Sequence, residues 1–399
     1  MSKRGAETQE GTLIKRARPS EVEASQQLII SSSNDERQQA LVRSVKRTSS
    51  LEAPIVSLSG AHSAEILSCR FDPSGQNIAA CSADRSICAS ILASQGFSTI
   101  RDQFEVDIWI MFRVIALWRT YPPNTNYGLL STIHKAPVLD LQWSLMHPLL
   151  YTVSADHTLA YTDLTTGARV RRLRAHRGII NALDRTVAGG AGVELIATAS
   201  DDGTVRVWEG GEEGSKEPVG VFEIGCPVTC VAWSADGATI YAGALDNEIH
   251  VLDLRKQTEL LTLTGHTDTP TSLALSPDGS YLLSPSLSSQ TLIYDVRPFS
   301  ASPNRIYCVL GGAPAGFEST LLKGAWSKED GGRRVALGGA DRTVTIWDVD
   351  SGKILYKLEQ LPGHKGTVTA VDFHPREPII LTGSKDATML LGEIEPGAL

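Results

Sequence analysis

The sequence of 399 residues lacks the short motifs on which most catalytic and nucleotide-binding sites depend. It contains no G-x-S-x-G nucleophile elbow, no Walker loop, no H-E-x-x-H zinc motif and no dinucleotide fingerprint. The glycine-rich stretch GGAPAG, residues 311–316, follows no strand–helix pattern and is interpreted as a loop. The sequence therefore predicts no catalytic residue, no cofactor, no metal and no small-molecule substrate, and an enzyme ranks third among the functional hypotheses.

Cysteine is scarce, and its spacing is not typical of a metal site. The six cysteines are Cys69, Cys81, Cys88, Cys226, Cys230 and Cys308. Only Cys226 and Cys230 lie close together, and their C-x-x-x-C spacing fits no zinc template. We interpret all six as reduced thiols in the core of an intracellular protein.

Apolar runs long enough to span a membrane are also missing. The apolar stretch at residues 106–117 is interrupted by Asp107 and Arg113 and is too short to cross a bilayer. The opening residues, MSKRGAETQEG, have no apolar core segment, so we expect no signal peptide. The pattern indicates no membrane partner.

What the chain does contain is typical of a soluble globular protein, with 42% hydrophobic and 21% charged residues. The net charge of −8 is unevenly distributed, because residues 1–47 hold nine Lys and Arg against six Asp and Glu. The rest of the chain is acidic. A protein that binds nucleic acid needs a basic face, so the acidic charge disfavours direct RNA binding by residues 48–399.

Residues 1–50 are rich in Ser, Gln, Glu and Arg and show little periodicity, so they are predicted to form a disordered tail. Two basic clusters, Lys3 with Arg4 and Lys15 with Arg16 and Arg18, are separated by ten residues. This spacing is typical of a two-part nuclear import signal, which would place the protein in the nucleus. The alternative is a solvated charged tail.

A turn motif typified by SDDGTVRVWE, residues 200–209, recurs in seven copies. The turn residues are Asp84, Asp156, Asp202, Asp246, Ser288, Asp341 and Asp386. Five copies carry a histidine about 20 to 26 residues earlier, namely His62, His134, His176, His266 and His364. The copies repeat with a period near 45 residues, which is typical of a repeat architecture.

Each period contains four short segments of alternating hydrophobicity separated by turns, which predicts a four-stranded antiparallel sheet, or blade. One blade cannot bury both of its faces, so seven copies predict a seven-bladed β-propeller of the all-β class over residues 51–399. The last copy ends after its third strand. We expect Ile55–Leu58 to supply the missing strand and close the ring.

The pattern from G-H to W-D resembles the WD-repeat propellers over residues 51–395. In that family a His, a Ser or Thr, the turn Asp and a Trp lock each blade by hydrogen bonds. The resemblance implies a structural role for His62, Ser82, Asp84, Trp118, His134, Ser154, Asp156, His176, Ser200, Asp202, Trp208, Asp246, His266, Asp341, Trp347, His364, Ser384 and Asp386. Only the copy with His176, Ser200, Asp202 and Trp208 has all four. Histidines can also serve as catalytic bases or metal ligands, but their repetition favours architecture.

The first copy is interrupted. Asp84 should be followed six residues later by a Trp, yet this Trp is Trp118, so residues 89–116 are interpreted as a 28-residue insertion in the third strand. Residues 85–88 and 113–116 fit the same strand pattern. We expect residues 113–120 to form the strand. The alternative explanation is a retained intron of 84 nucleotides.

Several loop and strand-end strings are more specific than the repeat itself. They are SSLEAPI at 49, DGSYLLS at 278, YDVRPF at 294, KILYKL at 353, and LPGH with FHPREPII up to residue 380. Together they resemble the family of WD-repeat subunits of the spliceosomal U5 small nuclear ribonucleoprotein. That resemblance implies a non-catalytic scaffold, monomeric within a larger complex, that acts in pre-mRNA splicing by binding the large central U5 protein and neighbouring factors. The departures are the insertion, SLSS at 286, and Glu359 with Gln360.

The second hypothesis is a substrate receptor of a cullin-type ubiquitin ligase. Such receptors resemble this chain at a D-x-R sequence after the W-D-like position, here Asp253 to Arg255 and Asp295 to Arg297. Either arginine can instead be a solvated charge at a strand end. The sequence does not indicate which loops bind which partner.

Overall fold

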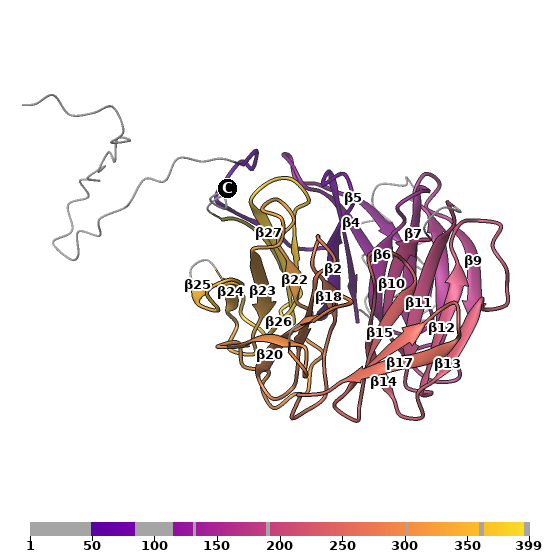
Figure 1. The fold of residues 1–399 in the computed structure, drawn as a ribbon. Helices are drawn as coiled ribbons and strands as arrows, with labels where there is room; N and C mark the ends of the chain where they lie inside the picture. The colour runs from indigo at the N-terminus through magenta and orange to yellow at the C-terminus, as the bar shows by residue number, and fades with distance from the viewer. Residues whose placement is uncertain are drawn as a thin grey trace, which may run out of the picture. The chain divides into compact units, whose positions relative to one another are not determined.

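The computed structural model describes residues 49–83, 115–130, 133–188, 192–300, 302–358 and 363–394. Every regular element in these ranges is a β-strand, and none of the described residues form a helix long and apolar enough to cross a membrane. The strands form seven four-stranded antiparallel sheets, arranged side by side as Figure 1 shows. The predicted all-β, seven-bladed propeller is confirmed.

Each blade has an inner strand, two middle strands and an outer strand, and we number the blades from the first inner strand. The inner strands are β2 (Ile66–Phe71), β6 (Val138–Trp143), β10 (Ile180–Val187), β14 (Val228–Trp233), β18 (Ala274–Leu275), β22 (Ala325–Trp326) and β26 (Val368–Phe373). The second strands are β3 (Asn77–Ser82), β7 (Leu149–Ser154), β11 (Glu194–Ser200), β15 (Thr239–Ala244), β19 (Tyr281–Pro285), β23 (Arg334–Gly338) and β27 (Ile379–Ser384).

The other two strands of each blade complete the sheet. The third strands are β4 (Ile115–Arg119), β8 (Thr158–Asp163), β12 (Thr204–Glu209), β16 (Ile249–Asp253), β20 (Gln290–Asp295), β24 (Val344–Asp348) and β28 (Met389–Glu393). The outer strands are β5 (Asn126–Leu130), β9 (Arg169–Arg174), β13 (Gly220–Glu223), β17 (Thr258–Leu263), β21 (Ile306–Gly311), β25 (Ile354–Leu358) and, in blade 7, β1 (Ile55–Leu58).

The hydrophobic core is divided among the junctions between blades. Seven clusters of buried apolar side chains lie between blades 1 and 2, 2 and 3, and so on around the ring to 7 and 1. The second strands are the most buried, and β7 and β11 are buried at every residue. Each sheet thus needs both neighbours to remove its two faces from water, which is the reason the repeats close into a ring.

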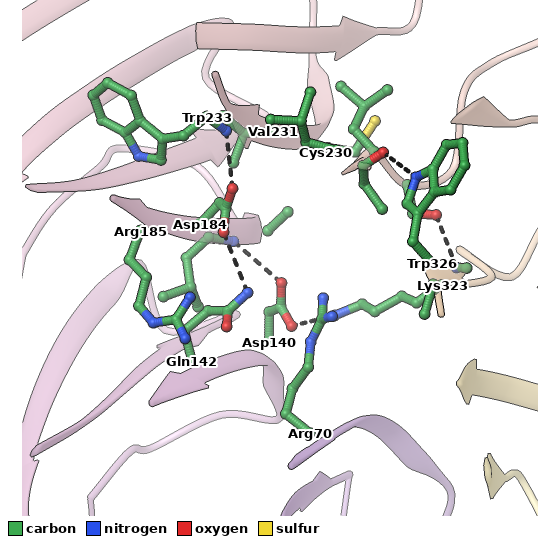
Figure 2. A pocket seen from close by; sticks show the side chains of 18 of the residues that line it. Arg70, Asp140, Gln142, Asp184, Arg185, Cys230, Val231, Trp233, Lys323 and Trp326 are labelled. Atoms are coloured by element: carbon green, nitrogen blue, oxygen red, sulfur yellow. Dashed lines mark hydrogen bonds and ion pairs between the residues drawn. The ribbon is translucent and has the colours of Figure 1, made fainter. Parts of the chain in front are cut away.

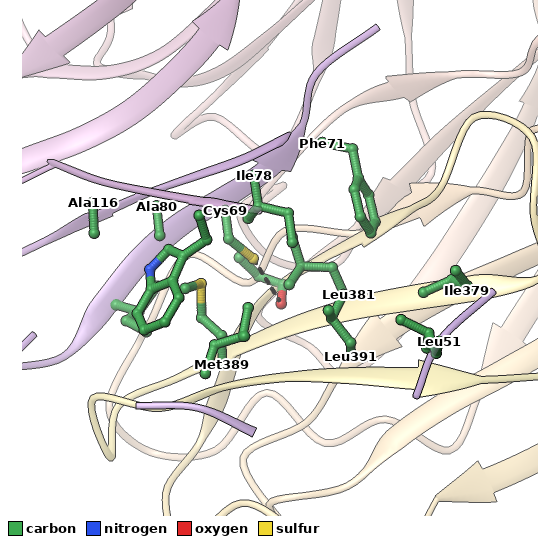
Figure 3. Packing of buried hydrophobic residues seen from close by; sticks show 14 residues of the cluster. Leu51, Cys69, Phe71, Ile78, Ala80, Ala116, Ile379, Leu381, Met389 and Leu391 are labelled. Atoms are coloured by element: carbon green, nitrogen blue, oxygen red, sulfur yellow. Dashed lines mark hydrogen bonds between the residues drawn. The ribbon is translucent and has the colours of Figure 1, made fainter. Parts of the chain in front are cut away.

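The ring is closed as the sequence predicts. Strand β1 pairs antiparallel with β28, with Ile55 opposite Gly392 and Leu58 opposite Met389. Just before β1, Leu51 is 4% exposed and packs with Leu381 and Leu391 of blade 7 in the cluster that also contains residues of blade 1 (Figure 3). The start of the described chain therefore joins blade 7 to blade 1.

The turn between the second and third strands requires an unusual backbone conformation. The residue after the turn Asp, or after Ser288 in blade 5, has a positive φ in the six blades whose turns are described, with values of 65° at His157, 76° at Gly203 and 71° at Asn247. Among these six, only blade 3 has glycine there, the residue that adopts this conformation without steric cost. The turn therefore forms without a glycine at this position.

Blade 1 uses the later of its two possible third strands. Strand β4 begins at Ile115, places Trp118 opposite Ile78 of β3, and pairs on its other side with β5. This is the strand that the sequence analysis expected, and Ile115 and Ala116 form part of it. The bounds of the insertion, residues 89–116, stay a prediction. The two candidate segments have the same alternation, so the boundary was ambiguous by sequence. Residues 84–114 lie outside the described residues.

Candidate functional site

The hydrogen-bonded set of blade 3 joins five side chains. Nδ1 of His176, in the connection between β9 and β10, lies 3.1 Å from both carboxylate oxygens of Asp202 and 3.1 Å from Oγ1 of Thr204. Nε2 of His176 lies 2.7 Å from Oγ1 of Thr198. Nε1 of Trp208 donates to the same Oγ1 at 3.0 Å. The network thus connects the turn to the second and third strands.

Protonation states follow from burial and from these partners. Burial lowers the pKa of His176 to about 4, so the imidazole is neutral at pH 7. Burial alone would raise the pKa of Asp202, but hydrogen bonds from Thr204, the Arg177 N–H and His176 outweigh it and lower this pKa to about 2. A neutral imidazole then donates from Nδ1 to the carboxylate and accepts at Nε2 from the Thr198 hydroxyl, which in turn accepts from Trp208.

Thr198 is the residue that the sequence analysis missed. Ser200 was predicted as the hydroxyl of the set, but its Oγ accepts a hydrogen bond from the Asp202 N–H at 3.2 Å and so holds the turn. Ser154 and Ser384 accept from Asp156 and Asp386 in the same way. The hydroxyl that reaches the histidine lies two residues earlier, because residues two apart on a strand share a face. The sequence signal that could have identified it is the threonine two residues before the turn serine, which recurs as Thr152 and Thr382.

Blades 2 and 7 have the same arrangement without the tryptophan. His134 contacts Thr152 at 2.8 Å and Asp156 at 3.4 Å. His364 contacts Thr382 at 2.7 Å and lies 3.6 Å from Asp386. The Trp position is occupied by Thr162 in blade 2 and by Gly392 in blade 7.

Blade 5 has the histidine but neither aspartate nor tryptophan. Nε2 of His266 lies 2.7 Å from Oγ of Ser284, whereas its Nδ1 is buried and has no hydrogen-bond partner among the described residues. The turn position is Ser288, whose Oγ lies 2.6 Å from that of Ser286. Tyr294 replaces the Trp, and its ring contacts His266 edge-on. Because blade 5 has no aspartate at its turn, Nδ1 of His266 lacks the carboxylate partner that Nδ1 of His176 has in blade 3.

Blades 4 and 6 lack the histidine and use their aspartates differently. Asp246 lies 3.0 Å from Nε2 of His250, a residue of β16. Asp341 forms an ion pair with Lys357 at 2.9 Å, and Nε1 of Trp347 donates to the Gly311 carbonyl at 3.0 Å.

Blade 1 is described only in part. His62 is buried, and Oγ of Ser82 donates to the carbonyls of Ala64 and Glu65. Trp118 is 6% exposed in the core. Asp84 lies outside the described residues, as do Lys3, Arg4, Lys15, Arg16 and Arg18.

A second polar region lies where the inner strands meet, around a cavity of about 490 Å³ (Figure 2). Lys323, at the start of blade 6, forms an ion pair at 2.6 Å with Asp140 of blade 2. Asp140 also accepts from Oγ of Ser68 at 2.8 Å and from the Leu183 N–H at 3.2 Å. Positive charge at Lys323 and Arg70 outweighs burial and lowers the pKa of Asp140. This contact joins blades that are not neighbours in the ring.

Other aspartates of the inner strands connect adjacent blades. Asp184 accepts a hydrogen bond from the Trp233 N–H of blade 4 at 2.9 Å. Asp372 accepts from the Phe71 N–H of blade 1 at 2.9 Å and pairs with Lys328 at 3.0 Å. Burial raises the pKa of Asp184, whose partners are mainly backbone and amide groups. These aspartates therefore connect the inner strands of neighbouring blades.

The polar side chains of both regions mainly contact other groups of the protein. In the hydrogen-bonded sets of the turns, here called locks, the histidine contacts a hydroxyl and, in blades 2, 3 and 7, the turn aspartate. The cavity carboxylates contact lysines, backbone N–H groups, the Ser68 hydroxyl and the Gln142 amide. Among the described residues no three His, Cys, Asp or Glu side chains are placed to hold a metal ion. The thiols of Cys69, Cys81 and Cys230 are buried, and burial raises their pKa values well above neutrality.

Comparison with known proteins first establishes the class. The family model described as "WD domain, G-beta repeat" matches residues 53–89, 167–209, 216–253, 257–295 and 355–391. The first match begins in blade 7, and the other four each run from the outer strand of one blade into the next. Together with the His–Asp contacts, these matches identify a WD-repeat β-propeller.

Similarity to whole proteins establishes the family. The chain is 37% identical over 350 residues to pre-mRNA-splicing factor cwf17 of Schizosaccharomyces pombe, covering 88% of this chain and 90% of that protein. It is 35% identical to the U5 small nuclear ribonucleoprotein 40 kDa protein of Dictyostelium discoideum, covering 89% of both chains. The Homo sapiens protein of the same name is 37% identical, covering 88% of this chain and 86% of that one. The chain belongs to the U5 40 kDa family of WD-repeat proteins.

Proposed function

We propose that this protein is a non-catalytic scaffold subunit of the U5 small nuclear ribonucleoprotein and acts in pre-mRNA splicing by binding other proteins. The observation that carries the proposal is the similarity to splicing proteins over nearly the full length of both chains. Because the match covers 88% or more of this chain, it extends beyond a single shared repeat. A propeller alone would not specify this function.

The physical properties of the ring support a scaffold. Contacts inside each blade and across the cavity hold the strands in fixed positions, so that loops and outer strands can present several surfaces at once. As direct partners we propose the large central U5 protein and neighbouring splicing factors, with RNA reached through the particle. The acidic character of the propeller agrees with protein rather than phosphate partners.

The ubiquitin-ligase alternative is not favoured. Its sequence basis was the arginine of two D-x-R sites. Arg297 makes two hydrogen bonds of 2.8 Å to the carboxylate of Asp295, and the Arg255 N–H bonds Asp253. The guanidinium of Arg297 is thus held by a local contact at a strand end, and the relatives that match most of this chain are splicing proteins.

Recovery of partners tests the proposal directly. A tagged copy of the full chain, purified from cells of its own organism, should bring down U5 RNA and splicing proteins. A matched control is a tagged guanine nucleotide-binding protein subunit beta, to which this chain is 27% identical over 57% of its length. Recovery of a cullin adaptor without U5 RNA would refute the proposal.

For the tail we propose nuclear import through Lys3, Arg4, Lys15, Arg16 and Arg18. The two clusters and their spacing in the sequence support this assignment. Residues 1–20 fused to a fluorescent protein should direct it to the nucleus, and replacing the five basic residues by Ala should abolish this. A cytoplasmic wild-type fusion would contradict the import role. The retained-intron explanation of residues 89–116 is tested by sequencing the transcript.

A further inference from the structure

The outer strand of blade 2 differs in charge from every other described outer strand. Strand β9 has the sequence RVRRLR and carries four arginines. The other six outer strands together carry one Lys or Arg, Lys357, which is paired with Asp341. No acidic residue occurs between residues 164 and 183, although the chain as a whole is acidic. A concentration of positive charge on one edge of an acidic body is a candidate interaction surface.

The arginines of β9, together with Arg177 just after it, divide into two groups by their contacts. In the first group, Arg169 donates to the Ile133 carbonyl at 2.9 Å. Arg172 pairs with Asp156 at 2.9 Å, and Arg171 lies 4.7 Å above the Tyr161 ring and bonds the Ser215 carbonyl. In contrast, the side chains of Arg174 and Arg177 are exposed and make no hydrogen bond or ion pair with the described residues. The first group shapes the strand, and the second leaves positive charge available to a ligand.

The backbone of β9 is also available. The strand lies at the edge of its sheet and pairs only with β8, so one side of its N–H and C=O groups faces outward. Val170, between two arginines, is 42% exposed. An edge strand with apolar and positive side chains matches an extended chain whose own side chains alternate between apolar and acidic, because both repeat about every 6.6–6.8 Å.

The same features favour a polypeptide over RNA. Single-stranded RNA binds through bases stacked on exposed aromatic rings, and Tyr161, the ring beneath Arg171, is fully buried. A nucleic-acid backbone would also meet the acidic remainder of the propeller. An extended acidic peptide can bind through β9 and its arginines alone.

We propose that β9, together with Arg174 and Arg177, binds an extended acidic segment of a partner protein, which adds as a fifth strand to blade 2. This inference rests on the proposed docking function and specifies one surface and one chemical class of partner. The carboxylates of the segment pair with the arginines, and its backbone forms hydrogen bonds with the outward N–H and C=O groups of β9.

Fluorescence anisotropy with designed peptides tests the proposal on the full chain. The probe alternates Glu and Val over about six pairs of residues. The Arg174→Glu/Arg177→Glu variant should bind it at least about 10-fold more weakly than wild type. The matched control, Lys256→Glu/Lys353→Glu, makes the same change in net charge at exposed positions of blades 4 and 6 and should bind like wild type.

Two further probes separate strand addition from general charge attraction. A Glu–Val peptide with every backbone nitrogen methylated has the same charge but no backbone N–H donors, so it should bind more weakly. A single-stranded RNA of equal charge should bind more weakly than the Glu–Val peptide. Equal binding by both double variants, tighter binding of RNA, or no binding of the Glu–Val peptide by wild type would each overturn the proposal.

Thermal melting verifies that the variants fold, and Arg174→Gln/Arg177→Gln replaces the charge-reversed pair if that one does not. The inference can fail while the proposed function stands, since U5 RNA and splicing proteins would then still be recovered with the wild-type chain. Loss of those partners from the wild type would instead refute the proposed function itself.

Discussion

Blades 3 and 5 have the same four strands but differ in the side chains at their turns. In blade 3, Asp202, His176, Thr198 and Trp208 form an unbroken chain of hydrogen bonds. In blade 5, Ser284 and His266 keep one contact of that chain. The strands of blade 5 nevertheless pair into one antiparallel sheet, with a single register shift between β20 and β21 at Ile293 and Tyr294, and apolar clusters bury both of its faces.

The comparison separates two roles. Packing against the neighbouring blades is sufficient to form a blade, because blade 5 forms without the lock. The lock therefore contributes stability to an individual blade rather than determining its fold. If so, changes at corresponding positions of blades 3 and 5 should have unequal effects.

The largest difference is expected at the turn residue. Asp202→Ala removes the carboxylate that accepts from His176, Thr204 and the Arg177 N–H, and should lower the free energy of unfolding by about 3 kcal/mol. Ser288→Ala, its counterpart in blade 5, should change it by less than about 0.5 kcal/mol. Urea unfolding followed by tryptophan fluorescence measures both. Equal losses in the two variants would show that the lock has no special role in blade 3.

A smaller effect is expected within the lock itself. Thr198→Val keeps the shape of the side chain but leaves Nε2 of His176 and Nε1 of Trp208 without their partner, at a cost of about 2 kcal/mol. Ser200→Ala removes only the acceptor of the Asp202 N–H and should cost about 1 kcal/mol. Denaturant midpoints of the two variants rank them. A larger loss for Ser200→Ala would favour the assignment made from sequence.

These two residues illustrate what could be predicted without a structure. The number of blades and the pairing of β1 followed from the period and from the missing last strand. Ser200 was assigned because it stands in the conspicuous turn, whereas Thr198 lies within the strand and was not assigned. The contact of Lys323 with Asp140 joins residues 183 positions apart, and local pattern carries no information about such a pair. The cluster of arginines in β9 can be seen in the sequence, but only the order of strands in the sheet shows that β9 lies at a free edge.

The smallest expected effect is a gain in blade 5. Ser288→Asp places a carboxylate at the position of Asp202, where it can accept from the unpaired Nδ1 of His266. The variant should be more stable than wild type by about 1 kcal/mol at pH 7. Ser288→Asn, which is similar in size but uncharged, is the control. A destabilised Ser288→Asp variant would mean that the turn of blade 5 cannot adopt the geometry of blade 3.

Measuring stability as a function of pH gives a second test of the Ser288→Asp variant. Burial lowers the pKa of His266 to about 4, below the value of about 6.5 expected in the unfolded chain. The unfolded state therefore binds more protons between these values, and this histidine makes stability fall as the pH falls from 6.5 to 4, by at most about 1.4 kcal/mol per pH unit. A carboxylate at position 288 raises the folded pKa of His266, so the variant should lose less stability than wild type over that range. Parallel curves of stability against pH for the two proteins would show that the new carboxylate does not reach the ring.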